Sequence, residues 1–266
     1  MNKYFQVFKT SLQEIFTYRL SFLLWKTRSV LGLLASYFTW LAIFQGKSII
    51  AGYTSKSMFA YVFGIYLLSE LIANSESINI GEEISSGDLS NYLLKPINYF
   101  YYWFSRDLAS KVMSAIFAII IIFFLFILFK PVFFFNQNIF FLPFFLFSVF
   151  FAIALNFYLN ILISFFSFWY PEHSGWPHRF FLNIVLTFLL GMYFPLDIFP
   201  KIISQLLTIL PTAYILYFPL QIYLGKISNF EIFWRMLVMF FWTILLIKLS
   251  KSVWTAGLKK YSSEGR

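Results

Sequence analysis

Long apolar stretches without charge alternate with short polar segments along the whole chain. A helix needs roughly 20 mostly apolar residues to cross the hydrocarbon core of a bilayer, and six stretches approach that length. Prolines and polar side chains interrupt the longest of them before Pro143, so we count a single helix there. The predicted spans are Ser29–Gly46, Ser57–Asn74, Val112–Phe129, Pro143–Phe168, Phe180–Leu196 and Phe230–Ile247. The pattern predicts an all-α integral membrane protein with six transmembrane helices, in a single domain over residues 1–266.

Composition agrees with this class, and charge decides the orientation. Hydrophobic residues make up 60% of the chain, whereas a soluble domain usually has about 45 to 50%. The net charge of +9 would suit nucleic acid, but the basic residues flank the spans instead of forming one patch, so we expect no nucleic-acid partner. Cytoplasmic segments carry the excess of Lys and Arg, which predicts that both termini are cytoplasmic. Fourteen of the 20 then lie inside: Lys3, Lys9, Arg19, Lys26, Arg28, Lys95, Arg106, Lys111, Arg179, Lys248, Lys251, Lys259, Lys260 and Arg266.

An amphipathic pattern precedes the first span. Its apolar residues recur at helical spacing, while Lys9, Gln13 and Glu14 fall elsewhere. The apolar positions are Tyr4, Phe5, Phe8, Leu12, Ile15 and Phe16. We expect a helix that lies in the cytoplasmic interface and contacts membrane lipid. An N-terminal extension of the first span is the alternative.

A proline-rich apolar segment separates the fifth predicted span from the sixth. Its prolines are Pro195, Pro200, Pro211 and Pro219. Each removes an amide donor and clashes with the preceding turn, so no continuous helix can form. The stretch Ile202–Leu210 between two of them is too short to span. We predict a re-entrant helical hairpin that enters the outer leaflet before the last helix, with an ordinary extracellular loop as the alternative.

The sequence offers no nucleotide-binding loop. Such a loop needs a glycine, four residues, and then Gly-Lys-Ser/Thr, so that backbone amides surround the phosphates. Gly-Lys-Ser occurs at Gly46, Lys47 and Ser48, but the position of the first glycine holds Leu41 in an apolar helix. We therefore expect that the chain does not hydrolyse ATP by itself.

The sequence also gives little support for a metal site or a catalytic site. Glu172, His173 and His178 share one short loop, but zinc sites need three or four ligands with further support, and the chain has only these two histidines. No acidic residue has a reason to complete a catalytic triad with them. With no cysteine either, we expect no enzyme, no metal and no cofactor.

Glu70 is a candidate of its own, because an acid inside a membrane span is by default a functional residue. It lies in the last turns of the second predicted span, near the depth of the headgroups. We expect an interfacial cap there, and a proton-coupling site is the alternative.

The longest predicted cytoplasmic loop contains the polar stretch GEEISSGDLSNYLLKPINYFYYWFSRDLASK, residues 81–111. A Gly-Asp turn, a short amphipathic helix over Leu89–Leu94 and a stop at Pro96 can be recognised in it. Such a helix suits docking into a groove on a soluble partner. It could instead cover the protein's own bundle.

The order of these features resembles the permease subunit of an ABC-2 type ATP-binding cassette exporter. The motifs that carry the resemblance are GDLSNYLLKPINYFYYWFSRDLASK in the loop and YFPLDIFPKIISQLLTILPTAYILYFPLQIYLG before the last helix. It implies a coupling helix that contacts a separate ATPase subunit, which would itself bind ATP and Mg. The implied coupling residues are Gly87, Asp88, Leu89, Tyr92, Leu93, Leu94, Lys95 and Pro96.

The resemblance also implies a second permease chain, identical or paralogous, and a place in the plasma membrane, the inner membrane of a bacterium. Substrates of the superfamily range across drugs, lipids, glycans and peptides, so no substrate follows. A membrane-embedded scaffold or assembly factor that holds a soluble cytoplasmic partner is the alternative function.

Overall fold

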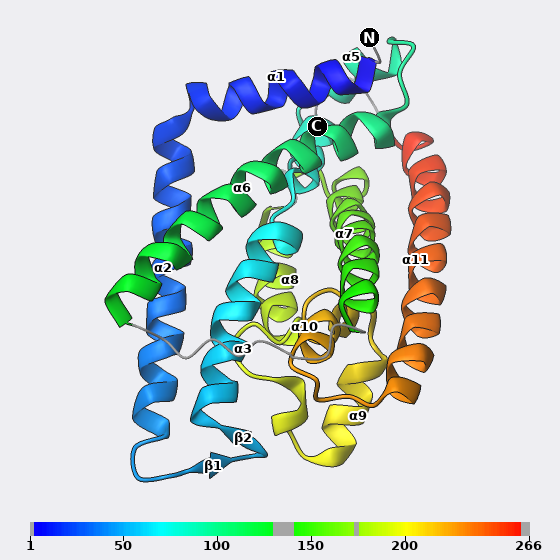
Figure 1. Ribbon diagram of the computed structural model, residues 1–266. Coiled ribbons are helices and arrows are strands. Elements are labelled where there is room, and N and C mark those ends of the chain that lie inside the picture. Colours follow the sequence, from blue (N-terminus) through cyan, green and yellow to red (C-terminus); the bar gives the residue numbers. More distant parts are fainter. Residues whose placement is uncertain (1–2, 130–140, 173–175, 262–266) are drawn as a thin grey trace.

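The computed structural model describes residues 3–129, 141–172 and 176–261 (Figure 1). The helices are α1 Lys3–Thr17, α2 Arg19–Ile43, α3 Ser55–Leu68, α4 Ile80–Ser85, α5 Leu89–Leu93, α6 Tyr99–Phe129, α7 Phe141–Ser164, α8 Trp176–Leu189, α9 Lys201–Ile209, α10 Tyr217–Tyr223 and α11 Asn229–Leu258. Shorter helical turns are η1 Ser69–Ala73, η2 Glu76–Asn79, η3 Phe165–Phe168, η5 Leu196–Ile198 and η6 Pro211–Tyr214. Strands β1 Ile49–Ile50 and β2 Tyr53–Thr54 form a small antiparallel hairpin.

Four helices in the described part of the chain are long and apolar enough to cross a membrane. They are α3 continued by η1, α6, α7 continued by η3, and α11. A bent pair, α9 with Pro211–Tyr223, would make a fifth if it counts as one span. The chain is therefore a multi-pass, helical membrane protein, but this criterion does not reach the predicted six.

Two predicted spans fall short for identifiable reasons. Helix α2 has 25 residues, but it begins at Arg19 and includes Lys26 and Arg28, which lower its hydropathy. Helix α8 has only 14 residues. It ends early because the chain turns at Gly191, where φ is +78°, a conformation that favours glycine.

The elements run back and forth between two ends of the molecule (Figure 1). Helix α1 lies across one end, and α2 leads from it to the β-hairpin at the other end, from which α3 returns. The last turns of α11 and the short helix α5 lie at the same end as α1, whereas α9 lies at the end of the β-hairpin. We call these the α1 end and the hairpin end.

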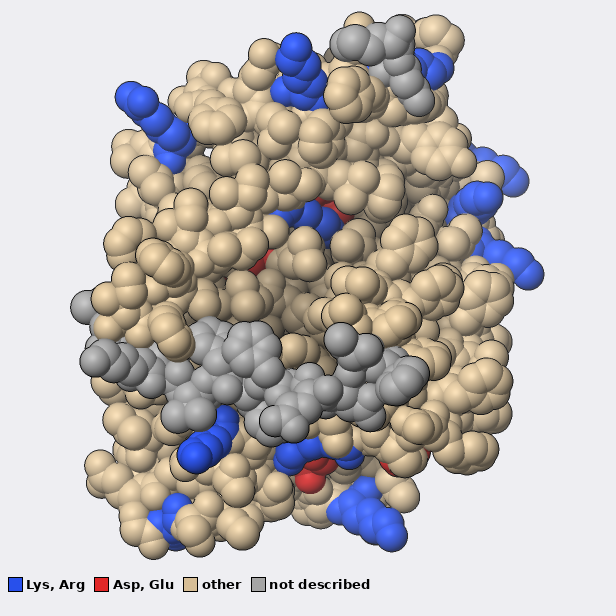
Figure 2. Space-filling model, in the orientation of Figure 1, with Lys and Arg blue, Asp and Glu red and all other residues tan. Residues whose placement is uncertain are grey.

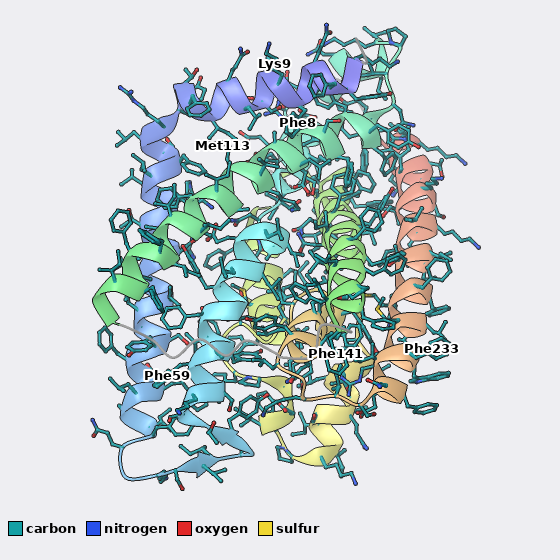
Figure 3. All side chains as sticks on the ribbon, in the orientation of Figure 1. Phe8, Lys9, Phe59, Met113, Phe141 and Phe233 are labelled. Carbon is teal, nitrogen blue, oxygen red and sulfur yellow. The ribbon has the colours of Figure 1, made fainter. Side chains whose placement is uncertain are left out.

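Helix α1 is a separate element and not an extension of α2, because the helix is interrupted at Tyr18. It packs mainly on α6. In Figure 3, Phe8 points towards α6 and Lys9 points away from the bundle, as the amphipathic pattern requires. Phe5 and Phe16, which belong to the predicted apolar face, are largely exposed, which leaves them accessible to lipid.

The core lies around α3 and α10. Most side chains of α3 and nearly all of α10 are buried, and α7 packs on both α10 and α11. By contrast, α6 and α11 expose many large apolar side chains, and Figure 3 shows Phe233 pointing outward. An exposed apolar belt of this kind suits contact with lipid. Figure 2 shows one such face, with lysines and arginines mostly around its margins and a few charged atoms visible in a hollow near its middle.

We predict that Gly257→Ala lowers the melting temperature in detergent, whereas Gly32→Ala raises it slightly. Both glycines lie within helices, where alanine is favoured by roughly 0.5–1 kcal/mol. A Cβ at Gly257 would overlap the ring of Phe168, and one at Gly32 would meet nothing within 4 Å. Overpacking costs typically 1–3 kcal/mol, so the two variants should differ in sign. Equal melting temperatures would show that α11 does not pack closely on η3.

Candidate functional site

The predicted coupling segment forms a short helix at the α1 end. Gly87, with φ +85°, makes the turn into it, and Asp88 precedes α5. Leu89 is fully buried in a second apolar cluster, formed by α4, α6, α7 and η3. Tyr92 is half-buried against this cluster, while Lys95 and Pro96 are exposed.

The two leucines at the end of α5 differ from Leu89. Leu93 is 45% exposed and Leu94 is 87% exposed. Leu89 and, in part, Tyr92 therefore pack on the protein's own bundle, whereas Leu93 and Leu94 remain accessible. The segment covers the bundle with Leu89, as one alternative expects, and leaves Leu93 and Leu94 accessible. Docking to a soluble partner stays a prediction.

Segments from both ends of the chain hold this loop in place. The hydroxyl of Tyr261, just after α11, donates to the carbonyl of Gly87 at 2.6 Å and accepts from the amide of Ser90 at 3.1 Å. From α1, the ammonium of Lys3 donates to the carbonyl of Pro96 at 2.6 Å. The position of α5 is thus coupled to α1 and α11.

A partly buried carboxylate and an aromatic cluster join the loop to the long helices. The Glu83 carboxylate, on α4, accepts hydrogen bonds from the Tyr99 hydroxyl at 2.6 Å and from Trp103 Nε1 at 3.3 Å. Burial raises the pKa of Glu83, and the hydrogen bond from Tyr99 opposes that rise. The ring of Trp254, on α11, stacks on Tyr99 with 4.9 Å between the ring centroids. A displacement of α4 or α5 would therefore act on α6 and α11.

The prolines of the predicted re-entrant segment coincide with the breaks between its helical pieces. Pro195 precedes η5, Pro200 precedes α9, and Pro211 is the first residue of η6. Pro219 lies in the first turn of α10. The bend between α9 and the following piece is 77°. Helix α9 buries none of its residues, whereas α10 lies in the core.

A hydrogen-bonded group at the hairpin end holds this segment against the β-hairpin. The Tyr53 hydroxyl donates to the Asp197 carboxylate at 2.8 Å and accepts from Gln221 Nε2 at 2.9 Å. Burial, followed by the charge of Asp197, raises the pKa of Tyr53 well above its ordinary value. Lys226 lies over the same ring.

The interior between the helices contains a charged pair that the sequence analysis did not anticipate. Lys26 on α2 and Glu70 on η1 are both buried and form an ion pair. The Lys26 ammonium also donates to the Ser114 hydroxyl at 2.7 Å, and Asn74 Nδ2 donates to the Glu70 carboxylate at 2.8 Å. Glu70 is therefore not the solvated cap that we expected, because α2 supplies its partner.

A second ion pair lies beside the first. On α6, Lys111 pairs with Asp107 at 3.0 Å and donates to the carbonyl of Asn74. Asp107 also accepts from the amide of Glu76 at 2.9 Å. The chain after α3 winds as a π-helix over Ser69–Ala73, and these contacts satisfy backbone groups where it leaves the helix. Asp107 and Lys111 are four residues apart, a spacing that allows an ion pair on one helix. The sequence analysis did not use this signal, because it assigned both residues to a loop.

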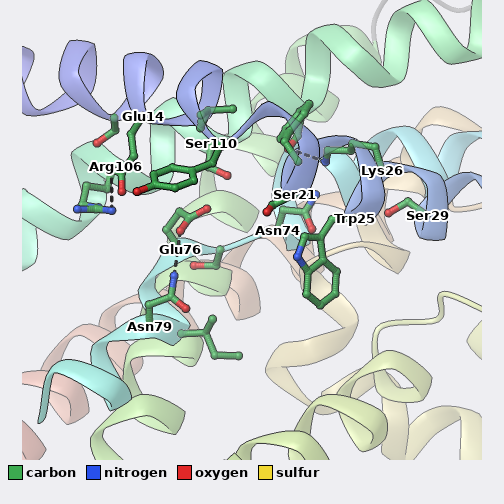
Figure 4. Close-up of a pocket in the computed structure, with 17 residues that line it drawn as sticks. Glu14, Ser21, Trp25, Lys26, Ser29, Asn74, Glu76, Asn79, Arg106 and Ser110 are labelled. Atoms are coloured by element: carbon green, nitrogen blue, oxygen red, sulfur yellow. Dashed lines mark hydrogen bonds and ion pairs between the residues drawn. The ribbon is translucent and has the colours of Figure 1, made fainter. Parts of the chain in front are cut away.

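Three adjoining cavities surround the first ion pair. Their volumes are about 490, 360 and 200 Å³, and Ser29 and Asn74 line all three. The first lies between α1, α2, η2 and α6, and Figure 4 shows Lys26, Trp25 and Ser21 on one side of it and Arg106 and Glu14 on the other. The second extends along α2 and α3, and the third reaches α7 and α8. This part of the protein can accommodate a polar group between apolar helices.

The described residues give no support to the metal site or the nucleotide-binding loop considered from the sequence. No group of three metal-ligating side chains occurs within the described ranges. His173 and the side chain of His178 lie outside the described residues, and Glu172 is exposed. Gly46, Lys47 and Ser48 lead into the β-hairpin and not into a helix, which does not match a phosphate-binding loop.

We predict that Lys26→Met destabilises the protein strongly and that adding Glu70→Gln restores most of the loss. Removing one partner of a buried ion pair leaves an uncompensated charge and costs about 3–5 kcal/mol, whereas replacing both is often nearly neutral. Thermal unfolding of the two single variants and the double variant in detergent measures this. A double variant that is less stable than either single one would show that the two residues act independently.

A comparison with known families places the chain. No curated protein matches it, but the model of a family described as "ABC-2 family transporter protein" matches residues 30–265. This match covers α3, α6, α7, α8 and α11, the α5 loop and the proline-rich segment. It includes Glu70 and the ion pair of Asp107 with Lys111, but it begins after Lys26. The chain therefore belongs to the ABC-2 family of transporter proteins, as a membrane component of an ATP-binding cassette transporter.

Proposed function

We propose that the chain is the permease subunit of an exporter that is driven by ATP hydrolysis in a separate ATPase subunit. The observation that carries the proposal is the α5 loop, where Leu93 and Leu94 are exposed on a segment that hydrogen bonds from α1 and Tyr261 hold in place. Exposed apolar side chains on a well-anchored polar loop suit a protein partner. In this proposal the partner binds ATP and Mg, and this chain supplies no catalytic group.

The connection from α5 to the spans supports a transport mechanism. Closure of the ATPase dimer would displace α5, and Leu89 would transmit the movement to the aromatic cluster. Within that cluster Tyr99 belongs to α6 and Trp254 to α11, so two spans would move together. Rigid-body motion of packed helices is an established means of opening and closing a cavity, and α6 lines the first of the three cavities.

We propose that α2 and α8 complete a set of six spans, with both termini in the cytoplasm of the cell. At 1.5 Å per residue, the 25 residues of α2 cover the thickness of a bilayer core, roughly 30 Å. Its cations lie in the half near α1, as expected for a cytoplasmic end. The membrane would be the plasma membrane, and the whole chain one permease domain.

The proline-rich segment would then be a re-entrant hairpin at the outer side. Backbone breaks at membrane depth are tolerated only where protein or water covers them. Helix α10 meets this condition because the core encloses it, and α9 exposes apolar residues such as Ile202. A second permease chain, identical or paralogous, would complete the translocation pathway.

The scaffold function remains the second candidate. A scaffold would also use Leu93 and Leu94 to hold a soluble partner, but it has no use for cavities between its helices. A transporter requires them, which favours the exporter. Copurification with an active ATPase separates the two functions.

We predict that a single cysteine at Asn91 is labelled only by a thiol reagent that crosses membranes, whereas one at Ser48 reacts from outside. Both positions are exposed, at opposite ends of the molecule, and the chain has no native cysteine. Intact cells treated with a permeant and an impermeant maleimide provide the measurement. Labelling of Asn91→Cys by the impermeant reagent would show that the α1 end faces outward, which contradicts the predicted topology.

We predict that Leu93→Asp with Leu94→Asp abolishes stimulated ATP turnover while the permease stays folded. Burying one leucine contributes roughly 1.5–3 kcal/mol, and each 1.4 kcal/mol is about tenfold in affinity. The measurements are copurification with the ATPase subunit and turnover of the complex.

Leu89→Asp is the matched control for this experiment. Leu89 is fully buried in the bundle, so its replacement should lower the melting temperature of the permease alone, and the double variant should not. Wild-type copurification and turnover in the double variant would contradict the docking role of α5.

A further inference from the structure

An arginine of α2 has no acidic partner. Of the cations in the first half of this helix, Lys26 is paired with Glu70, but no ion pair within the described residues includes Arg28. Counting from Arg19 at 1.5 Å per residue, Arg28 lies about 13 Å along the helix. Arg28 directly precedes the predicted span Ser29–Gly46, so it lies near the depth of the lipid headgroups, where basic pockets between helices bind anionic groups.

The surroundings of Arg28 provide such a cavity. The second cavity, of about 360 Å³, is lined by Arg28, Ser29, Tyr66 and Thr187. The Arg28 guanidinium lies over the ring of Trp25, 5.4 Å from its centroid, and Trp25 lines the same cavity. Figure 4 shows Trp25 where it also borders the first cavity.

A second observation indicates a missing ligand. The Tyr66 hydroxyl is buried and has no hydrogen-bond partner, although Tyr66 lines the cavity and is only 5% exposed. Buried hydroxyls usually have a partner. An acceptor atom in the cavity would supply one.

The charge balance of the cavity favours an anion. Glu70 lines it, but the ion pair with Lys26 compensates that charge. Arg28 therefore remains as a net positive charge among hydroxyl groups. A guanidinium matches the planar geometry of carboxylate and phosphate oxygens, so the ligand group is one of these.

The position of the cavity identifies the kind of molecule that carries the anion. Arg28 and Trp25 are exposed residues of α2, and so are apolar neighbours such as Leu31, which is 60% exposed. A headgroup bound at Arg28 would leave its apolar tails along this lipid-facing surface. A water-soluble anion would gain nothing from it.

We propose that the cavity between α2 and α3 binds the anionic headgroup of an amphiphile, with Arg28 as the anion-binding residue and Tyr66 as a hydrogen-bond donor. The inference rests on the proposed function, since it names amphiphiles with a phosphate or carboxylate headgroup as the exported class. Ser29 and Thr187 add hydroxyls from α2 and α8.

Photolabelling tests the binding step without the ATPase. The purified permease in phosphatidylcholine nanodiscs receives a trace of photoactivatable, radiolabelled phosphatidic acid. We expect Arg28→Gln to reduce specific labelling about tenfold, as the loss of one charge-assisted contact would, and Tyr66→Phe to reduce it by a smaller factor. Arg28→Lys should retain part of the labelling because it keeps the charge.

Two further variants control for general effects of charge and folding. Arg19→Gln removes an arginine from the same helix, but Arg19 lines none of the three cavities, so labelling should stay at the wild-type level. Gly32→Phe fills the cavity, because Gly32 lines it and a Cβ there meets nothing within 4 Å. Labelling of this variant should fall, and its melting temperature verifies that it is folded.

The competitors distinguish the source of the anion. Unlabelled phosphatidic acid should displace the probe, and inorganic phosphate or phosphatidylcholine should not. Displacement by inorganic phosphate would overturn the amphiphile, and equal labelling of wild type, Arg28→Gln and Gly32→Phe would overturn the site. Labelling that depends on Arg28, without stimulated turnover in the complex with its ATPase, would support the cavity and contradict the exporter function.

Discussion

The ion pair between Lys26 and Glu70 is the interaction on which the interior of this protein depends. A charge among apolar helices is tolerated only with a partner, and here the two partners belong to α2 and η1. Ser114 and Asn74 extend the pair to α6 and to the end of the π-helix. Helices that expose apolar surface to lipid are thus held together by a small polar centre.

The same constraint explains where the backbone departs from regular helix. In an apolar surrounding each freed backbone group needs a partner, and side chains of α6 and α7 supply partners at the break after α3. Asn156 of α7 donates to the carbonyl of Ile72 at 2.7 Å, and the Lys111 ammonium donates to the carbonyl of Asn74. The breaks around the prolines lie beside the buried α10. Asn156, which donates to the backbone after α3, also lines the third cavity.

The α1 end combines firm anchoring with an exposed contact surface. Hydrogen bonds from Lys3 and Tyr261 hold the α5 loop, Leu89 anchors it in the aromatic cluster, and Leu94 remains accessible. A loop that followed its partner passively would transmit little movement. Because this loop is fixed to α6 and α11, a partner bound to it in the proposed exporter would act on both spans.

Much of this organisation follows from the sequence alone. Apolar length and charge distribution determine a helical, multi-pass membrane protein, and the loop and proline motifs resemble the family that the comparison establishes. Helix bounds near Pro143 and Ser57 could be predicted because apolar runs and prolines are local signals. The start of α6 at Tyr99 could not, since Arg106, Asp107 and Lys111 indicate a polar loop when their partners are unknown.

Only the tertiary structure decided which charges are buried and which leucine of α5 is free. Lys26 and Glu70 are 44 residues apart, and no local pattern reveals that packing brings them together. Leu89 and Leu94 are alike in sequence, yet α4 and η3 cover one and not the other. Which side chains are buried and which charges pair depends on contacts between distant segments. The position of a membrane span or a turn depends on neighbouring residues in the chain.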